Sequence, residues 1–77
     1  LAWLYHESGD ARALETARRA HEIAPRNAAI ADTLGVILVA SNQVDEGLTL
    51  LREAAAAAPA AADIQYHLAE ALTRKGA

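Results

Sequence analysis

Apolar and polar residues follow one another along the chain with the spacing of amphipathic helices. Small and large apolar residues recur every three or four positions, as in Ala13, Ala17 and Ala20, with charged residues between them. Gly, Pro and Asn interrupt this pattern at intervals, and these residues end helices or form turns. The pattern predicts helices over residues 1–8, 11–24, 28–41, 44–58 and 60–76.

The pattern repeats with a period of 34 residues. Four residues recur at this offset: Ala20 as Ala54, Pro25 as Pro59, Leu34 as Leu68 and Leu38 as Leu72. A fixed period of this size indicates stacked helix-turn-helix units. We assign 1–27 to a partial repeat, 28–61 to a full repeat, and 62–77 to the first helix of a next repeat or a capping helix. The pattern begins in mid-repeat without an initiator Met, so we expect a fragment of a longer chain.

The sequence also predicts how the helices are capped and where two of them pack closely. We expect Asp10 and Asn27 to cap the helices that follow them, and Asn42 to adopt the left-handed conformation that ends a helix. Gly35 and Gly47 lie inside predicted helices, where glycine costs about 1 kcal/mol relative to alanine. We expect each to permit a close approach of the partner helix.

These features resemble the tetratricopeptide repeat (TPR) family. That family favours a bulky residue, Leu-Gly and Tyr in its first helix, Gly in the turn, Ala, an aromatic and Ala in its second helix, and Pro after it. The matching residues of the full repeat are Leu34, Gly35, Leu38, Asn42, Gly47, Leu51, Ala54 and Pro59. Ala31 and Gln65 depart from the family's bulky first-helix residue. The first repeat is also one residue short, since Gly9 to Pro25 spans 16 positions and Asn42 to Pro59 spans 17. The resemblance implies an all-α, antiparallel array of about five helices forming an α-α superhelix.

In that family the first helices line a concave groove that binds a partner. Carried over to this sequence, the groove positions are Trp3, His6, Glu7, Asp32, Thr33, Val36, Tyr66, His67, Glu70 and Arg74. Trp3 and Tyr66 would be aromatic anchors for a peptide. Alternatively, Trp3 packs on a preceding helix and Tyr66 packs on Val36. The Lys and Asn clamp with which some members grip a peptide carboxylate is missing, so the acidic groove favours a neutral or basic ligand.

Composition and charge argue against several other functions. The 77-residue chain has a net charge of −3, which disfavours nucleic acid, and no apolar run of the length that spans a membrane. A zinc site needs three or four converging ligands, whereas His6 and His67 come from different repeats and His21 lies on the solvated side of its predicted helix. Ser8 and Ser41, the two serines, lie at predicted helix ends, and no nucleophile or phosphate-loop motif is present. We therefore expect no enzyme activity, no cofactor and no metal.

The predicted function is a protein–protein interaction scaffold that binds a peptide or partner protein. Four short motifs, at residues 1–4, 9–14, 31–35 and 64–69, give a narrower resemblance to the C-terminal repeats of exosortase-associated (PEP-CTERM-system) TPR lipoproteins. It implies a periplasmic, lipid-anchored bacterial protein linked to exopolysaccharide export; without it, the cytoplasm is the default. The alternative is a spacer or terminal cap of a longer solenoid. Partly bare apolar ends would then favour a homo-oligomer: Leu1, Leu4, Ile64, Leu68 and Leu72.

Overall fold

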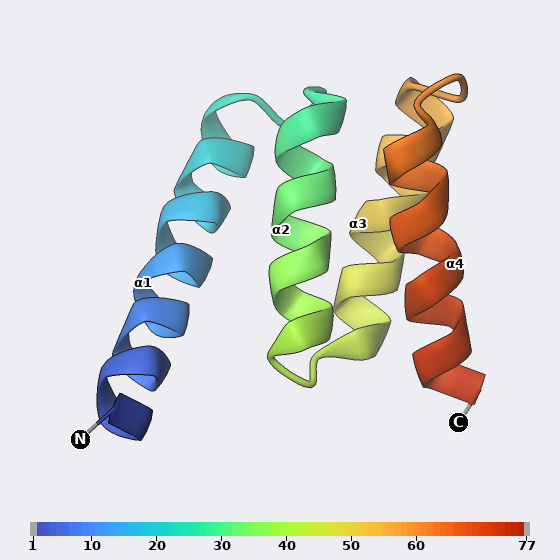
Figure 1. Ribbon diagram of the computed structural model, residues 1–77. Helices are drawn as coiled ribbons and strands as arrows, with labels where there is room; N and C mark the ends of the chain where they lie inside the picture. Colours follow the sequence, from blue (N-terminus) through green and yellow to red (C-terminus); the bar gives the residue numbers. More distant parts are fainter. Residues whose placement is uncertain (1, 77) are drawn as a thin grey trace.

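The chain folds into helices that run antiparallel to their neighbours in sequence (Figure 1). The computed structural model describes the backbone of residues 2–76 and the side chains of residues 12–76. The helices are α1 (Ala2–Ile23), α2 (Ala28–Ala40), α3 (Val44–Ala57) and α4 (Ala62–Gly76). No strand occurs in the described backbone. The all-α prediction is therefore confirmed.

The structure has four helices in the described backbone where about five were predicted, because α1 continues through Gly9 and Asp10. The expected turn and the expected cap at Asp10 are thus wrong. A glycine inside a helix costs only about 1 kcal/mol. A separate helix over residues 1–8 would be about two turns long, too short to be stable without strong packing. Continued backbone hydrogen bonding outweighs the small cost of Gly9.

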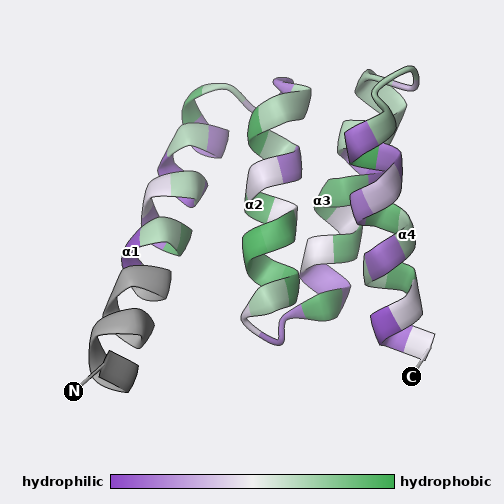
Figure 2. Cartoon of the chain, viewed as in Figure 1, coloured by the Kyte–Doolittle hydropathy of each residue, from purple (hydrophilic) through white to green (hydrophobic). Residues whose placement is uncertain are grey.

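Helix α2 is the centre of the molecule and contacts each of the other three helices. Its only polar side chains are Asp32 and Thr33, and Figure 2 shows it as the most continuously apolar helix. A helix that is apolar on most sides must be covered on most sides. Helix α1 covers one flank of α2, while α3 and α4 cover two others.

Helices α2 and α3 form a tight hairpin that crosses at two glycines. A Cβ built on Gly35 would lie 2.8 Å from Leu51 Cγ and 3.0 Å from the carbonyl oxygen of Gly47. A Cβ on Gly47 would lie 2.6 Å from Val39 Cγ2. The predicted close approach at both glycines is confirmed.

Both turns that flank α2 follow the sequence prediction. Asn27 is the N-cap, and its Oδ1 accepts a hydrogen bond from the Ile30 backbone N–H at 3.2 Å. Asn42 has φ 69°, the left-handed conformation. The Gln43 N–H donates to the Leu38 carbonyl at 2.8 Å, and the Asn42 N–H donates to the Val39 carbonyl at 3.2 Å. These two bonds form the Schellman ending of a helix.

Three small apolar clusters hold the helices together. In one of them Ala17 of α1 and Leu50 of α3 pack with Leu34 and Leu38 of α2. The other two join α2, α3 and α4: Val39, Leu48, Leu51 and Ala71, and Ala31, Ala54 and Ile64. Ile64 is only 4% exposed, so the expectation that it is bare is wrong, because α2 and α3 cover it. Leu72 is 43% exposed, in line with that expectation.

Two exposed ion pairs connect helices that are distant in sequence. Arg18 Nη1 of α1 lies 2.7 Å from Glu46 Oε2 of α3. Lys75 Nζ near the end of α4 lies 2.6 Å from Asp45 Oδ1 at the start of α3. The hydrogen bond from Arg18 lowers the pKa of Glu46, and the one from Lys75 lowers the pKa of Asp45. Because all four side chains are exposed, each pair contributes little to stability.

Candidate functional site on the α2–α4 face

Helices α2 and α4, one repeat apart in sequence, are joined by two polar contacts. Asp32 Oδ1 lies 2.9 Å from His67 Nδ1, and Arg74 Nη1 donates to the Val39 carbonyl at 3.2 Å. In both contacts the two residues are 35 positions apart. The contacts fix the spacing of the two helices near the middle and near the end of α4. They therefore create a defined surface across α2 and α4.

Asp32 differs from the sequence expectation of an exposed groove residue. The residue is 8% exposed, and its carboxylate faces a histidine ring that is itself partly covered. A buried carboxylate needs hydrogen-bond partners because desolvation is costly. Asp32 and His67 therefore hold the two helices together, and neither side chain is freely available to a ligand.

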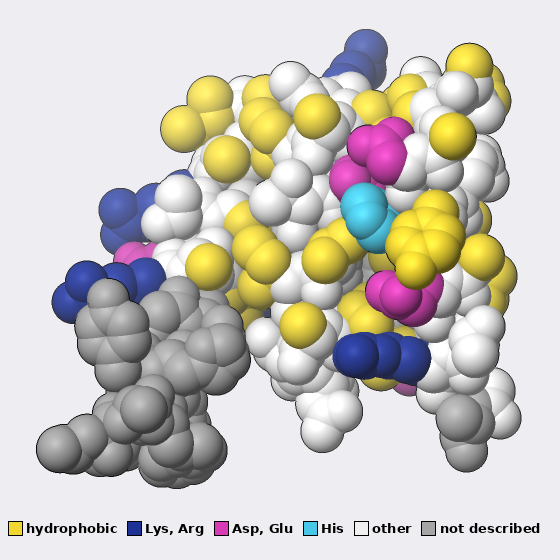
Figure 3. All heavy atoms as spheres, in the orientation of Figure 1, with side chains coloured by type: hydrophobic (Ala, Val, Ile, Leu, Met, Phe, Trp, Pro, Cys, Tyr) yellow, Lys and Arg dark blue, Asp and Glu magenta, His cyan; other side chains and the backbone are white. Residues whose placement is uncertain are grey.

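The exposed groove positions form what we call the α2–α4 face. It comprises Thr33, Val36 and Ala40 of α2 and Tyr66, Glu70 and Arg74 of α4. Tyr66 is 63% exposed and Val36 is 37% exposed. Figure 3 shows this face, with acidic, histidine, aromatic and basic side chains following one another over α2 and α4.

Tyr66 is held by its neighbours on α4. Its ring lies edge-on to that of His67 at a centroid distance of 5.9 Å. Its hydroxyl donates to Glu70 Oε2 at 3.4 Å, a long hydrogen bond. The alternative in which packing on Val36 covers Tyr66 does not fit its exposure. Tyr66 presents most of its ring to solvent.

Two hollows lie along this face. The larger, of about 540 Å³, lies between the start of α2 and the start of α4, and its charged lining residues are Asp32 and Asp63. The smaller, of about 70 Å³, is lined by residues that include Val36, Glu70 and Arg74. The face is therefore acidic at the end where α4 begins and of mixed charge at the other end. Asp63 lies in the first turn of α4, so its carboxylate stands at the acidic end of this face.

Three of the predicted groove residues lie outside the described side chains: Trp3, His6 and Glu7. The other seven come from α2 and α4 and meet on one side of the molecule. Sequence reasoning did not find the Asp32–His67 pair, although the offset of 35 on facing helices was a usable signal. It also did not find the hydrogen bond from Arg74 to the Val39 carbonyl. Because every residue has a backbone carbonyl, the sequence of Val39 gives no sign that it is the acceptor.

The described side chains show no group of three or more His, Asp or Glu residues placed to hold a metal ion. In the described part of the chain, no helix has the length and apolar character needed to cross a bilayer. His21, expected to be solvated, has its Nε2 atom buried without a hydrogen-bond partner among the described residues. The exposed residues of the α2–α4 face are aromatic, aliphatic and charged.

Comparison of the chain with family models, with curated proteins and with solved structures finds no match.

Proposed function

We propose that this chain is a non-enzymatic, TPR-like interaction module that binds an extended peptide segment of a partner protein on the α2–α4 face. The observation that supports this most is the exposure of Tyr66, at 63%, on a face whose helices are fastened by polar contacts. Exposed aromatic rings on rigid surfaces are the residues that most often dominate binding energy. A surface already in place also loses little entropy when a ligand binds.

The charges of the face define the ligand we propose. Asp63 and Glu70 are exposed carboxylates near Tyr66 in sequence, whereas one nitrogen of Arg74 already donates to the Val39 carbonyl. A basic or neutral segment complements this surface better than an acidic one. We propose a segment that places an apolar side chain against Tyr66 and Val36 and a Lys or Arg near the carboxylates.

The biological setting in this proposal comes from the narrower resemblance. A scaffold with this face would serve in bacterial envelope assembly linked to exopolysaccharide export, on the periplasmic side, as part of a lipid-anchored parent protein. This setting concerns the whole parent protein, whereas the binding face concerns the helices described above.

A library of displayed, unstructured twelve-residue peptides tests the binding face directly. We expect selection on the wild-type chain to enrich peptides that combine a basic residue with an aromatic or aliphatic one. Tyr66→Ala should weaken their binding by about tenfold or more. Because Tyr66 is exposed, the melting temperature should remain close to that of the wild type.

Two control variants make this test specific. Tyr66→Phe retains the ring and should retain binding. Glu70→Lys should weaken basic peptides, whereas Glu53→Lys, the same charge change on an exposed position of α3, should not. If no peptide is enriched, or if enriched peptides bind Tyr66→Ala as well as the wild type, the proposed face is wrong. Unchanged binding with a lowered melting temperature would favour a structural spacer.

A further inference from the structure

The charged residues of the α2–α4 face follow a fixed order along α4. One side of this helix carries residues whose positions lie within about 100° of one another around the helix axis: Asp63, Tyr66, His67, Glu70 and Arg74. Asp63 is the first of them and Arg74 is the last, and a rise of about 1.5 Å per residue separates the two by about 16 Å along the axis. Figure 3 shows acidic side chains toward one end of this face and a basic side chain at the other. A ligand that lies along α4 therefore meets opposite charges at its two ends.

The end of the face at Asp63 is acidic. The hollow of about 540 Å³ at this end has Asp32 and Asp63 as its charged lining residues, and its described lining includes no Lys or Arg. Asp32 Oδ1 contacts His67, whereas Asp63 is exposed in the first turn of α4. A hollow of this size has room for a Lys or Arg side chain. A cation that enters it is attracted by Asp63 directly and by Asp32 at longer range.

The opposite end of the face has Arg74 as its outermost charge. Arg74 Nη1 donates to the Val39 carbonyl at 3.2 Å, but this acceptor carries no net charge and a guanidinium has five N–H donors. The ion pairs between described side chains do not include Arg74. Glu70 lies one turn nearer to the middle of the face, where its carboxylate accepts a hydrogen bond from the Tyr66 hydroxyl. The charge of Arg74 is therefore available to an anionic group of a ligand.

We propose that the segment bound on the α2–α4 face is bipolar, with a Lys or Arg at the Asp63 end, an apolar residue on Tyr66 and Val36, and an Asp or Glu at the Arg74 end. This inference rests on the function proposed above and defines its ligand further. Alternate side chains of an extended segment point the same way and are about 6.6 Å apart. Three such side chains span about 13 Å, and the length of the charged side chains covers the remaining distance to the two ends of the face.

Three synthetic peptides that differ only in charge test the charge order. Their sequences are Lys-Ser-Leu-Ser-Glu (bipolar), Lys-Ser-Leu-Ser-Lys (basic) and Glu-Ser-Leu-Ser-Glu (acidic), each acetylated and amidated so that the termini carry no charge. NMR titration of the labelled chain at low ionic strength gives the three dissociation constants. We expect the bipolar peptide to bind about threefold more tightly than the basic one, as for an exposed ion pair, and the acidic peptide to bind most weakly. The difference should diminish in high salt.

Charge variants at the two ends make the test independent of the direction in which a peptide lies. Arg74→Glu should reverse the preference, so that the basic peptide binds more tightly than the bipolar one. Arg74→Gln retains a donor for the Val39 carbonyl but has no charge, and it should remove the preference. Asp63→Lys should favour the acidic peptide over the bipolar one. Lys75→Glu is the matched control, because Lys75 pairs with Asp45 of α3 instead of facing this surface, and it should leave the preference of the wild type unchanged.

The outcomes separate this inference from the proposed function. If the basic peptide binds the wild type as tightly as the bipolar one, or if Lys75→Glu changes the preference as much as Arg74→Glu, the charge order is wrong. Binding that Tyr66→Ala still weakens would then leave the proposed face intact. If none of the three peptides binds, the proposed function fails and the inference fails with it. Circular dichroism of each variant checks that the helices have formed.

Discussion

At the scale of single residues, Gly35 and Gly47 set how closely α2 and α3 pack. Their backbones approach so closely that a Cβ at Gly35 would meet Leu51 and the Gly47 carbonyl at 3.0 Å or less. A backbone atom has little freedom to move away. At these two positions the close contact therefore outweighs the lower helix propensity of glycine.

Gly35→Ala should therefore destabilise the protein even though alanine is the better helix former. Overpacking of a close contact costs about 1–3 kcal/mol, more than the propensity gain of about 1 kcal/mol. Gly76→Ala is the matched control, since its Cβ would meet nothing within 4 Å. Urea unfolding followed by circular dichroism measures both. A Gly35→Ala variant as stable as Gly76→Ala would contradict the close crossing.

A second prediction at this scale concerns His21, whose buried Nε2 atom has no hydrogen-bond partner among the described residues. His21→Leu removes this unsatisfied group and should raise the free energy of unfolding by about 0.5–1 kcal/mol. His67→Leu is the control. It leaves Asp32 without its partner and should lower that free energy by about 1–3 kcal/mol. Thermal unfolding compares the two, and a loss of stability in both variants would mean that His21 is satisfied.

At the scale of helices, the sequence predicts most of the structure, and it fails where long-range packing decides. The turns at Asn27 and Asn42 carry local signals, a side-chain cap and a residue that tolerates positive φ, and both were predictable. Gly9 carries a similar signal, but a turn there also requires a packed partner for the first helix. The polar contacts of the candidate site, such as Asp32 with His67, depend on the exact placement of α4 on α2 and have no local signal.

The contact between α1 and α3 leads to a prediction about pH. The hydrogen bond from Arg18 holds the pKa of Glu46 below its ordinary value of 4.5. A carboxyl group with a lowered pKa in the folded state stabilises the protein above its unfolded pKa, and this stabilisation is lost as the pH falls through the folded value. The wild type should therefore melt slightly higher than Glu46→Gln at pH 7, and the difference should shrink below about pH 4.5.

Because both side chains are more than 40% exposed, the effect should be small and should diminish in high salt. Melting curves of the two proteins from pH 7 to pH 3 give the difference directly. A difference that stays constant over this range would mean that the pair does not form in solution.

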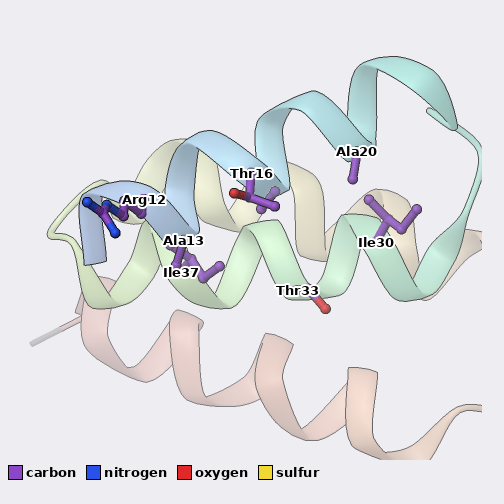
Figure 4. A pocket seen from close by; sticks show the side chains of 8 residues that line it. Arg12, Ala13, Thr16, Ala20, Ile30, Thr33 and Ile37 are labelled. Atoms are coloured by element: carbon purple, nitrogen blue, oxygen red, sulfur yellow. The ribbon is translucent and has the colours of Figure 1, made fainter. Parts of the chain in front are cut away.

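At the scale of the whole molecule, the helices present two surfaces of different chemistry. The α2–α4 face carries charged and aromatic groups over helices joined by polar contacts, which suits an extended basic segment. A hollow of about 450 Å³ between α1 and α2 is lined mostly by apolar side chains such as Ala20, Ile30 and Ile37 (Figure 4).

The most direct test of the proposed binding face is an NMR titration of the ¹⁵N-labelled chain with a basic peptide obtained from the library selection. We predict that the largest amide shift changes cluster on the α2–α4 face, at Thr33, Val36, Tyr66 and Glu70. Changes confined instead to the exposed side of α3, around Arg52, would contradict the account.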